Sequence, residues 1–382
     1  MAELPASLLS LFEVGVALTR RTATGRVLTA RYAPLVDDAA LPERLRTPVR
    51  AELDAAWEAV VVPIEREVIE KALPKAVKGL SKEPLAITPT AQVHAAELEG
   101  EPVAVKIARP GVAPTIRGEL MLLDALAGPL RIVFGALDVR GVLREVRESV
   151  MDELDLEHEA ETQHQVRRAL RRVDDVTVPA VHVDECAPNL LVTELLKGPT
   201  LAATAPKDPE RVAELLVTAH LVAWREAGLV LTDARPSHVI LLDGGGIGLL
   251  GAGLARPLSR DRMPLHLAAF AALGGDDQTA FVAAVEALEL LDGETAARAF
   301  ALLREVLGPF VAGETKLDAA ALEQLSQRAY RRAADLLALG ARATPEPADL
   351  AAGRMLGQLT ATLARIGATA DWPALAARAA SA

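Results

Sequence analysis

The chain has 382 residues, a formal net charge of -11 and a single cysteine. Its length is ample for two lobes with separate cores. The acidic balance argues against a general nucleic-acid binder, because phosphates are held by basic faces. Cys186 alone excludes an internal disulfide and a cysteine-built zinc site. With 51% apolar but only 3% aromatic residues, we expect Ala, Leu and Val to build mainly helical cores.

Residues 7 to about 78 are predicted to be helical, because apolar positions recur at three- and four-residue spacing. The apolar run from Ser7 to Leu18 is interrupted by Glu13 and followed by Arg20 and Arg21, so it is too short for a membrane span. We therefore expect a cytoplasmic protein with at most peripheral membrane contact through an amphipathic N-terminal helix. A plain packing helix explains the same pattern.

A β-hairpin is predicted within residues 84–108. Apolar residues alternate before and after the acidic turn Glu99-Gly100-Glu101: Val93, Ala95 and Leu98, then Val103, Val105 and Ile107. Residues 117–172 are predicted to be helical with an interruption near Gly141, and strands are predicted at 176–183 and 190–195. After Gly198-Pro199 the pattern is mainly helical, with short strands at 239–242 and 247–250, and only helices from Leu265 onward.

This order predicts an α+β protein with a small strand-rich lobe and a larger helical lobe. The expected division is a helical extension over 1–78, a small lobe over 79–197, a large lobe over 198–345 and a C-terminal helical segment over 346–382.

Lys106 lies in the apolar strand VAVKIA, where it either reaches water or points at a negative group. A buried ammonium needs a carboxylate partner, and the acidic segment MDELDLEHEAE offers Glu153 and Glu159. Six residues are about one and two-thirds helical turns, so on one straight helix both cannot aim at the same point. We predict that Glu153 is the partner of Lys106 and that Glu159 makes a second contact in the cleft; a solvated helix face is the alternative.

Residues 232–259 resemble the phosphoryl-transfer centre of a kinase without its metal ligands. Asp233 stands where the catalytic base belongs, as a vestigial base. His238 replaces the following Asn, and Gly251-Ala252-Gly253 replaces the Asp-Phe-Gly segment. In such a fold the strand end containing Thr193, Glu194 and Leu196 is the hinge that would bind adenine through its backbone, although any strand exit has this pattern.

Together these segments resemble the AarF/UbiB (ADCK) family of atypical kinase-like proteins over about residues 80–260. AQVHAAELEGEPVAVKIARPGV is similar to that family's alanine-rich loop, its Gln-Val-His strand and its Val-Lys-x-x-Arg-Pro-Gly strand. DELDLEHEAE resembles its Glu-Leu-Asp-x-x-x-Glu-Ala segment, and VPAVHVDECAPNLLVTELLKGPTL resembles its Val-Pro strand and hinge. The resemblance implies a two-lobed kinase-like fold and a link to isoprenoid quinone or lipid metabolism.

Four departures from the family pattern affect the expected chemistry. The family loop His-x-Asp-x-His-Pro-Gly-Asn is here Leu231 to His238, and the N-terminal Lys-x-Gly-Gln segment is Ala23-Thr24-Gly25-Arg26. Pro89 removes a backbone donor from the alanine-rich loop. Magnesium needs oxygen ligands, and Gly251 supplies none.

We therefore expect a pseudokinase that binds ATP or ADP weakly or not at all, without magnesium, and acts through an unidentified protein or lipid partner. One alternative is a working kinase or ATPase with Asp233 as base, Lys106 and Glu153 on the phosphates, and a metal held by Glu159, His238 or Asp243. Another is an interaction module whose cleft is filled by side chains.

Overall fold

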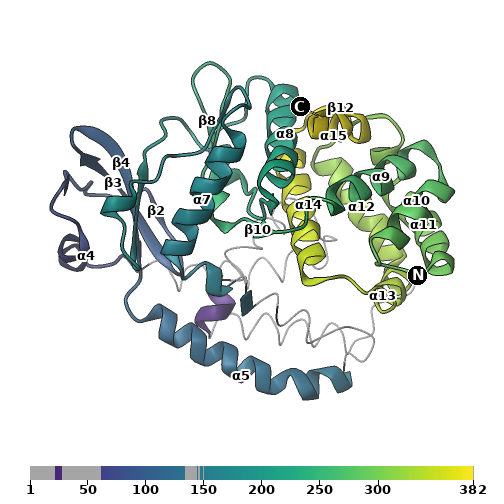
Figure 1. Ribbon diagram of the computed structural model, residues 1–382, viewed down its shortest axis with the longest axis horizontal. Coiled ribbons are helices and arrows are strands. Elements are labelled where there is room, and N and C mark those ends of the chain that lie inside the picture. Colours follow the sequence, from purple (N-terminus) through teal and green to yellow (C-terminus); the bar gives the residue numbers. More distant parts are fainter. Residues whose placement is uncertain (1–21, 28–61, 134–143, 145–146, 149, 382) are drawn as a thin grey trace.

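The computed structural model describes residues 22–27, 62–133, 144, 147–148 and 150–381. In Figure 1 a strand-rich part lies at one side and a helical part at the other, with α7 and α8 between them. The helical segments expected before residue 62 lie outside the described residues except for a helical turn at 23–27, and so does the interruption expected near Gly141.

The small lobe is built on an antiparallel five-stranded sheet in the order β1-β3-β4-β6, with β2 paired to β3. Its strands are β1 (Val77–Lys78), β2 (Ala86–Ile87), β3 (Ala91–Leu98), β4 (Glu101–Ala108) and β6 (Leu190–Glu194). The predicted hairpin is confirmed: Leu98 pairs with Glu101 across a two-residue turn. Glu99 and Gly100 in this turn have φ values of 53° and 90°, as tight hairpin turns require.

Alternation along β4 decides which side chains face the cleft. Val103, Val105 and Ile107 are buried on one face, where they pack in a core with residues of β3, β6 and helix α4 (Arg66–Ala72). Because successive strand residues point to opposite faces, Lys106 lies on the other face with Ala104 and Ala108.

Two helices connect the sheet to the rest of the molecule. Helix α5 (Val112–Val133) runs along the lower edge in Figure 1. Helix α7 (Leu156–Leu170) begins at the N-cap Asp155, whose side chain accepts a hydrogen bond from the His158 N–H at 3.0 Å. Val166 and Leu170 of α7 belong to the core of the helical part.

The helical part is centred on α8 (Pro209–Ala227), whose buried face supplies much of the largest core. Two short elements precede α8, β5 (Val176–Thr177) and the 3-10 turn η1 (Val183–Glu185). The short strands after α8 are β7 (Leu229–Val230), β8 (Val239–Leu241), β9 (Ile247–Leu249) and β10 (Arg256–Pro257), and the 3-10 turns after it are η2 (Pro236–His238), η3 (Gly251–Leu254) and η4 (Gly308–Val311). The remaining helices are α9 (Arg262–Gly275), α10 (Gln278–Ala287), α11 (Gly293–Leu307), α12 (Ala319–Arg331), α13 (Ala333–Gly340), α14 (Pro347–Ile366) and α15 (Trp372–Ser381).

The α+β kinase-like arrangement is confirmed, and three local predictions are wrong. The stretch predicted to be helical up to about residue 78 ends in strand β1 (Val77–Lys78). Only Val176 and Thr177 of the strand predicted at 176–183 form a strand, in parallel with β9. The region after Leu265 is not wholly helical, because β11 (Glu314–Lys316) pairs with β12 (Thr369–Asp371). Both strands are three residues long, so they leave almost no alternation to detect. Among the described residues, the structure contains no helix that is long and apolar enough to cross a bilayer.

Candidate functional site

The cleft face of the small-lobe sheet presents Lys106 to the start of α7. The Lys106 Nζ donates to both carboxylate oxygens of Glu159, at 2.8 and 2.6 Å. The carboxylate is buried, with its side chain 7% exposed, and the lysine side chain is 20% exposed. In kinases, a lysine on a small-lobe strand that is paired with a glutamate on a helix places the phosphates.

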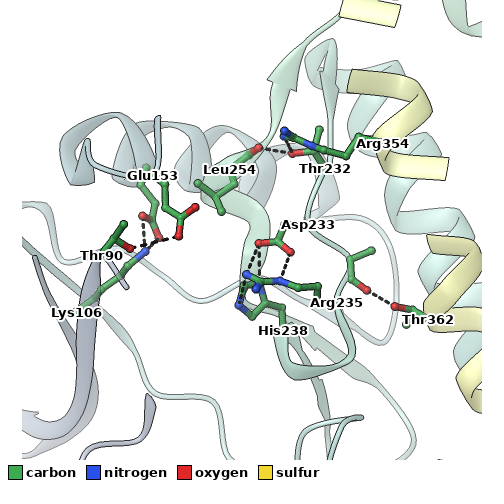
Figure 2. Close-up of polar contacts among 12 residues, drawn as sticks. Thr90, Lys106, Glu153, Thr232, Asp233, Arg235, His238, Leu254, Arg354 and Thr362 are labelled. Atoms are coloured by element: carbon green, nitrogen blue, oxygen red, sulfur yellow. Dashed lines mark hydrogen bonds and ion pairs between the residues drawn. The ribbon is translucent and has the colours of Figure 1, made fainter. Parts of the chain in front are cut away.

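The predicted partner of Lys106 was wrong: it is Glu159, not Glu153. The two glutamates do not share a straight helix, because the chain turns at residues 153–154 and α7 starts afresh after Asp155. Glu159 therefore faces the sheet from the first turn of α7. Glu153 lies before that turn and accepts a hydrogen bond from Thr90 Oγ1 at 3.3 Å (Figure 2).

The loop that would cover a phosphate is occupied by its own contacts. The Thr88 N–H donates to Ala91 O at 2.8 Å, and the Ala91 N–H donates to Thr88 Oγ1 at 2.9 Å. Pro89 has no N–H. Arg109 fixes the same loop from outside, donating from Nε to Thr88 O at 2.7 Å. Most of the backbone donors in this loop are therefore already used.

The predicted hinge residues leave β6 with their backbone groups partly engaged. The Glu194 N–H donates to Ala180 O at 2.8 Å, and the Leu195 N–H donates to Pro102 O at 3.2 Å. Thr193 pairs with Ala104 in the sheet. Leu196 packs over β9, where its side chain would lie 2.5 Å from a Cβ placed on Gly248.

Asp233 is a buried carboxylate with a cation bound to it. Arg235 donates to both of its oxygens, at 2.6 and 2.8 Å, and His238 Nδ1 lies 3.2 Å from Asp233 Oδ2 (Figure 2). The His238 contact is close enough for attraction but is not aligned as a hydrogen bond. Arg235 also donates to His238 Nε2 at 3.3 Å, so the three side chains form one cluster, which we call the Asp233 cage.

Charges within the cage keep Asp233 ionised. Burial alone would raise the pKa of its carboxyl, but the Arg235 charge, with a smaller contribution from His238, holds that pKa well below its ordinary value. Burial alone would likewise lower the pKa of Arg235, whereas Asp233 and, less strongly, Glu153 raise it. Asp233 is thus an anion committed to an internal ion pair.

The position of the kinase metal ligand is filled by backbone. A Cβ placed on Gly251 would lie 2.6 Å from Asp233 O and 2.9 Å from His238 Nδ1. A Cβ on Gly253 would lie 2.2 Å from Glu159 Cγ and 2.8 Å from Glu159 O. Real side chains do not approach backbone atoms so closely, so this segment has room only for glycine at both positions. Within the described residues no three His, Cys, Asp or Glu side chains are grouped to hold a metal ion.

Helix α14 holds the loop on both sides of Asp233. Thr362 Oγ1 donates to Ala234 O at 2.6 Å, and the guanidinium of Arg354 donates to Thr232 Oγ1. Thr232 in turn donates to Leu254 O at 2.8 Å, just after the Gly251-Ala252-Gly253 segment (Figure 2). The sequence patterns did not indicate the two contacts from α14, because their partners are more than 100 residues apart.

The remaining predicted site features lie apart from the Asp233 cage. Asp243 is in the turn that follows β8, at an exposed position. The segment 23–26 begins a helical turn whose Ala23 and Thr24 N–H groups donate to Glu119 of α5, at 2.8 and 2.7 Å. Arg235 was overlooked as a functional residue, although its spacing of two from Asp233 was a signal for an ion pair.

Comparison with known proteins agrees with this geometry. Residues 49–284, more than half of the chain, match the family model of the ABC1 atypical kinase-like domain. A "Probable protein kinase UbiB" of Pseudomonas paraeruginosa is 39% identical over 121 residues, covering 31% of this chain and 23% of that protein. One of Klebsiella pneumoniae is 33% identical over 152 residues, covering 36% and 28%.

A solved structure, the complex of Rv3197 with erythromycin from Mycobacterium tuberculosis, matches in fold with a TM-score of 0.65. It is 22% identical in sequence, and the match covers 97% of this chain and 94% of that one. The AarF/UbiB resemblance expected from the Gln-Val-His and Glu-Leu-Asp segments is confirmed by these matches. The chain belongs to the ABC1 atypical kinase-like family.

Proposed function

We propose that this chain is a pseudokinase of the UbiB type, which binds ATP or ADP weakly, without magnesium, and acts by binding a protein or lipid partner. The main support for the proposal is that no side chain fits at Gly251. A Cβ there would stand 2.6 Å from Asp233 O, so the carboxylate that seats magnesium in a kinase has no place in this loop.

The anion-binding half of a kinase site is retained beside this loss. Lys106 and Glu159 make the expected ion pair, and an ammonium at that point attracts a phosphate. Asp233 opposes it. A bare carboxylate about 4 Å from a phosphate charge would repel it by roughly 4 kcal/mol at an effective dielectric near 20, but the Arg235 guanidinium bound to Asp233 offsets much of this repulsion. Weak binding is the expected balance.

The alternative of a working kinase or ATPase requires Asp233 as a base and an unconventional metal ligand among Glu159, His238 and Asp243. The geometry favours it less, because both Asp233 oxygens accept from Arg235 and both Glu159 oxygens accept from Lys106. The family resemblance supports a role in isoprenoid quinone or lipid metabolism, in which the partner or lipid would be found.

Thermal melting of the full chain with ATP or ADP, each with magnesium or with a chelator, tests the proposal. We expect a small rise in melting temperature that is equal in both conditions and is lost in Lys106→Met. Lys82→Met is the matched control, since Lys82 is exposed on the same lobe. A rise that needs magnesium and disappears in Lys106→Met would establish the working enzyme instead. No rise with any nucleotide would favour the interaction module with a filled cleft.

A further inference from the structure

A small cavity lies behind Asp233, between α8 and the loop that carries the Asp233 cage. Its walls are mostly apolar, and three lining residues have polar side chains, His220, Asp233 and His238; the others are Leu231, Ala234, Val239, Leu249, Gly251 and Ala252. Its size suits roughly one water molecule. Asp233, His238 and Gly251 stand at kinase-motif positions, so the cavity borders the degenerate catalytic loop; the proposed function gives it no occupant.

His220 lines this cavity and has a ring nitrogen without a hydrogen-bond partner among the described residues. The residue is 1% exposed, and its Nδ1 lies 2.7 Å from Leu216 O of the same helix. A carbonyl only accepts, so the ring hydrogen is on Nδ1 and Nε2 is left as an acceptor. Burial lowers the pKa of His220 to about 4, so the ring is neutral near pH 7. Nε2 is buried without a hydrogen-bond partner among the described residues.

Asp233 and His238 are the other two polar residues that line the cavity, and His238 Nδ1 is likewise buried without a hydrogen-bond partner in the part of the chain that the structure describes. Asp233 is ionised and therefore offers only acceptor oxygens. An occupant that faces both His220 Nε2 and this carboxylate must donate on two sides, which excludes an anion or an apolar group. A cation would donate, but it would meet the Arg235 guanidinium already bound to Asp233. A neutral molecule with two donors and the size of water remains.

We propose that this cavity is a specific site for one water molecule, which donates one hydrogen to His220 Nε2 and the other to the Asp233 carboxylate. The water links α8 to the loop of the Asp233 cage. It also gives His220 Nε2 a hydrogen-bond partner, and a buried acceptor without a partner would destabilise the fold. His220 thereby becomes a positioning residue for Asp233, acting from behind. This inference stands whether or not the chain binds nucleotide.

A crystal structure of the full chain at about 1.5 Å resolution tests the site directly. We expect one peak of density at hydrogen-bond distance, roughly 2.7–3.2 Å, from His220 Nε2 and from an Asp233 oxygen. Data collected at the zinc absorption edge should show no anomalous signal at that peak. A cavity without density, or a peak with anomalous signal, would overturn the proposal; the second result would establish a metal site.

Stability in solution gives a second readout. His220→Phe keeps a ring of similar size but removes Nε2 together with the Nδ1 that donates to Leu216 O, so the density peak should vanish. The ratio of unfolded to folded protein should rise about tenfold or more, because a hydrogen-bonded group has been lost. A His220→Phe chain as stable as the natural chain, or more stable, would contradict the proposal by showing that Nε2 has no partner. If the variant fails to fold, the crystal structure of the natural chain still decides.

Discussion

Asp233 stands at the position of a kinase base, yet its surroundings give it a structural task. Its side chain is 3% exposed and that of Arg235 is 15% exposed, so the pair is shielded from water. Breaking such a pair by removing one partner leaves an uncompensated buried charge. The carboxylate should therefore matter to the stability of the fold, whereas a base kept only for catalysis should not.

We predict that Asp233→Asn lowers the free energy of unfolding by roughly 3–5 kcal/mol. The amide keeps the shape of the carboxylate but leaves the Arg235 charge unbalanced. Urea unfolding followed by circular dichroism measures the change. Asp175→Asn is the matched control, because Asp175 pairs with Arg211 on the surface, with side chains 51% and 39% exposed; it should cost less than about 1 kcal/mol. If the Asp233→Asn chain were as stable as the natural one, Asp233 would have no structural role and would be interpreted as a catalytic residue only.

Individual residues also show where the sequence was informative. Lys106 could be placed in the cleft, because alternation in VAVKIA puts it opposite Val105 and Ile107. The sequence could not show whether Glu153 or Glu159 pairs with Lys106. The answer depends on a break in the helix at residues 153–154, and the acidic residues there are also compatible with a continuous helix. The water site also escaped notice, because His220 lies in an ordinary apolar helical pattern.

Helix α14 holds the loop that carries Asp233 in place. It holds Ala234 through Thr362 and Thr232 through Arg354, so both neighbours of Asp233 are fixed by one element. At its N-terminal end, Asp349 accepts from Arg262 of α9, at 2.9 and 2.7 Å. Helix α14 thus ties the cage to the distal helices α9–α11, which have a core of their own.

We predict that Thr362→Val destabilises the chain by roughly 1–2 kcal/mol, since it replaces a fully buried hydroxyl by a methyl group of similar size. Thr362→Ser should recover most of the loss because it keeps the donor to Ala234. Chemical unfolding of both variants checks this, with Thr360→Val on the same helix as the control. Equal stability of Thr362→Val and the natural chain would show that α14 does not hold the loop through this bond.

Helices and strands were predicted correctly where the apolar pattern extended over many residues. The hairpin of β3 and β4 offered eight residues per strand, and the helices after Leu265 offered several turns each. The β11–β12 pair was missed because its two strands are 53 residues apart at their nearest ends and each has only three residues. Contacts of this kind depend on the packing of the whole lobe, which local sequence does not encode.

At the scale of the molecule, the two lobes have separate apolar cores that meet at α7. The sheet core contains Val103, Val105 and Ile107, whereas Val166 and Leu170 of α7 belong to the core around α8. The ion pair of Lys106 and Glu159 therefore joins the sheet to a helix anchored in the other lobe.

The acid stability of the whole chain should depend on His220. Its pKa is about 4 in the folded state, against an ordinary value of 6.5. Between pH 4 and pH 6.5, His220 is protonated in the unfolded chain but neutral in the folded chain. The free energy of unfolding therefore keeps its full value above pH 6.5 and falls as the pH drops toward 4. The expected loss is about 3 kcal/mol.

Urea unfolding at several pH values between 7 and 4 measures this loss. The natural chain should lose about 3 kcal/mol more than His220→Phe over this range, since the variant lacks the titrating group while the other acids and bases remain. Parallel pH profiles for the two chains would show that His220 is protonated equally in both states.

Helix α15 carries Trp372 and Leu375 into the same core as α8, and Trp372 Nε1 donates to Thr315 O at 3.1 Å. Synthesis delivers these side chains last among the described residues. A nascent chain still on the ribosome therefore has an unfinished large lobe, with apolar side chains of α8 uncovered until translation reaches α15. Chaperones could bind these uncovered side chains in that interval. A premature stop before residue 372 would leave them uncovered permanently.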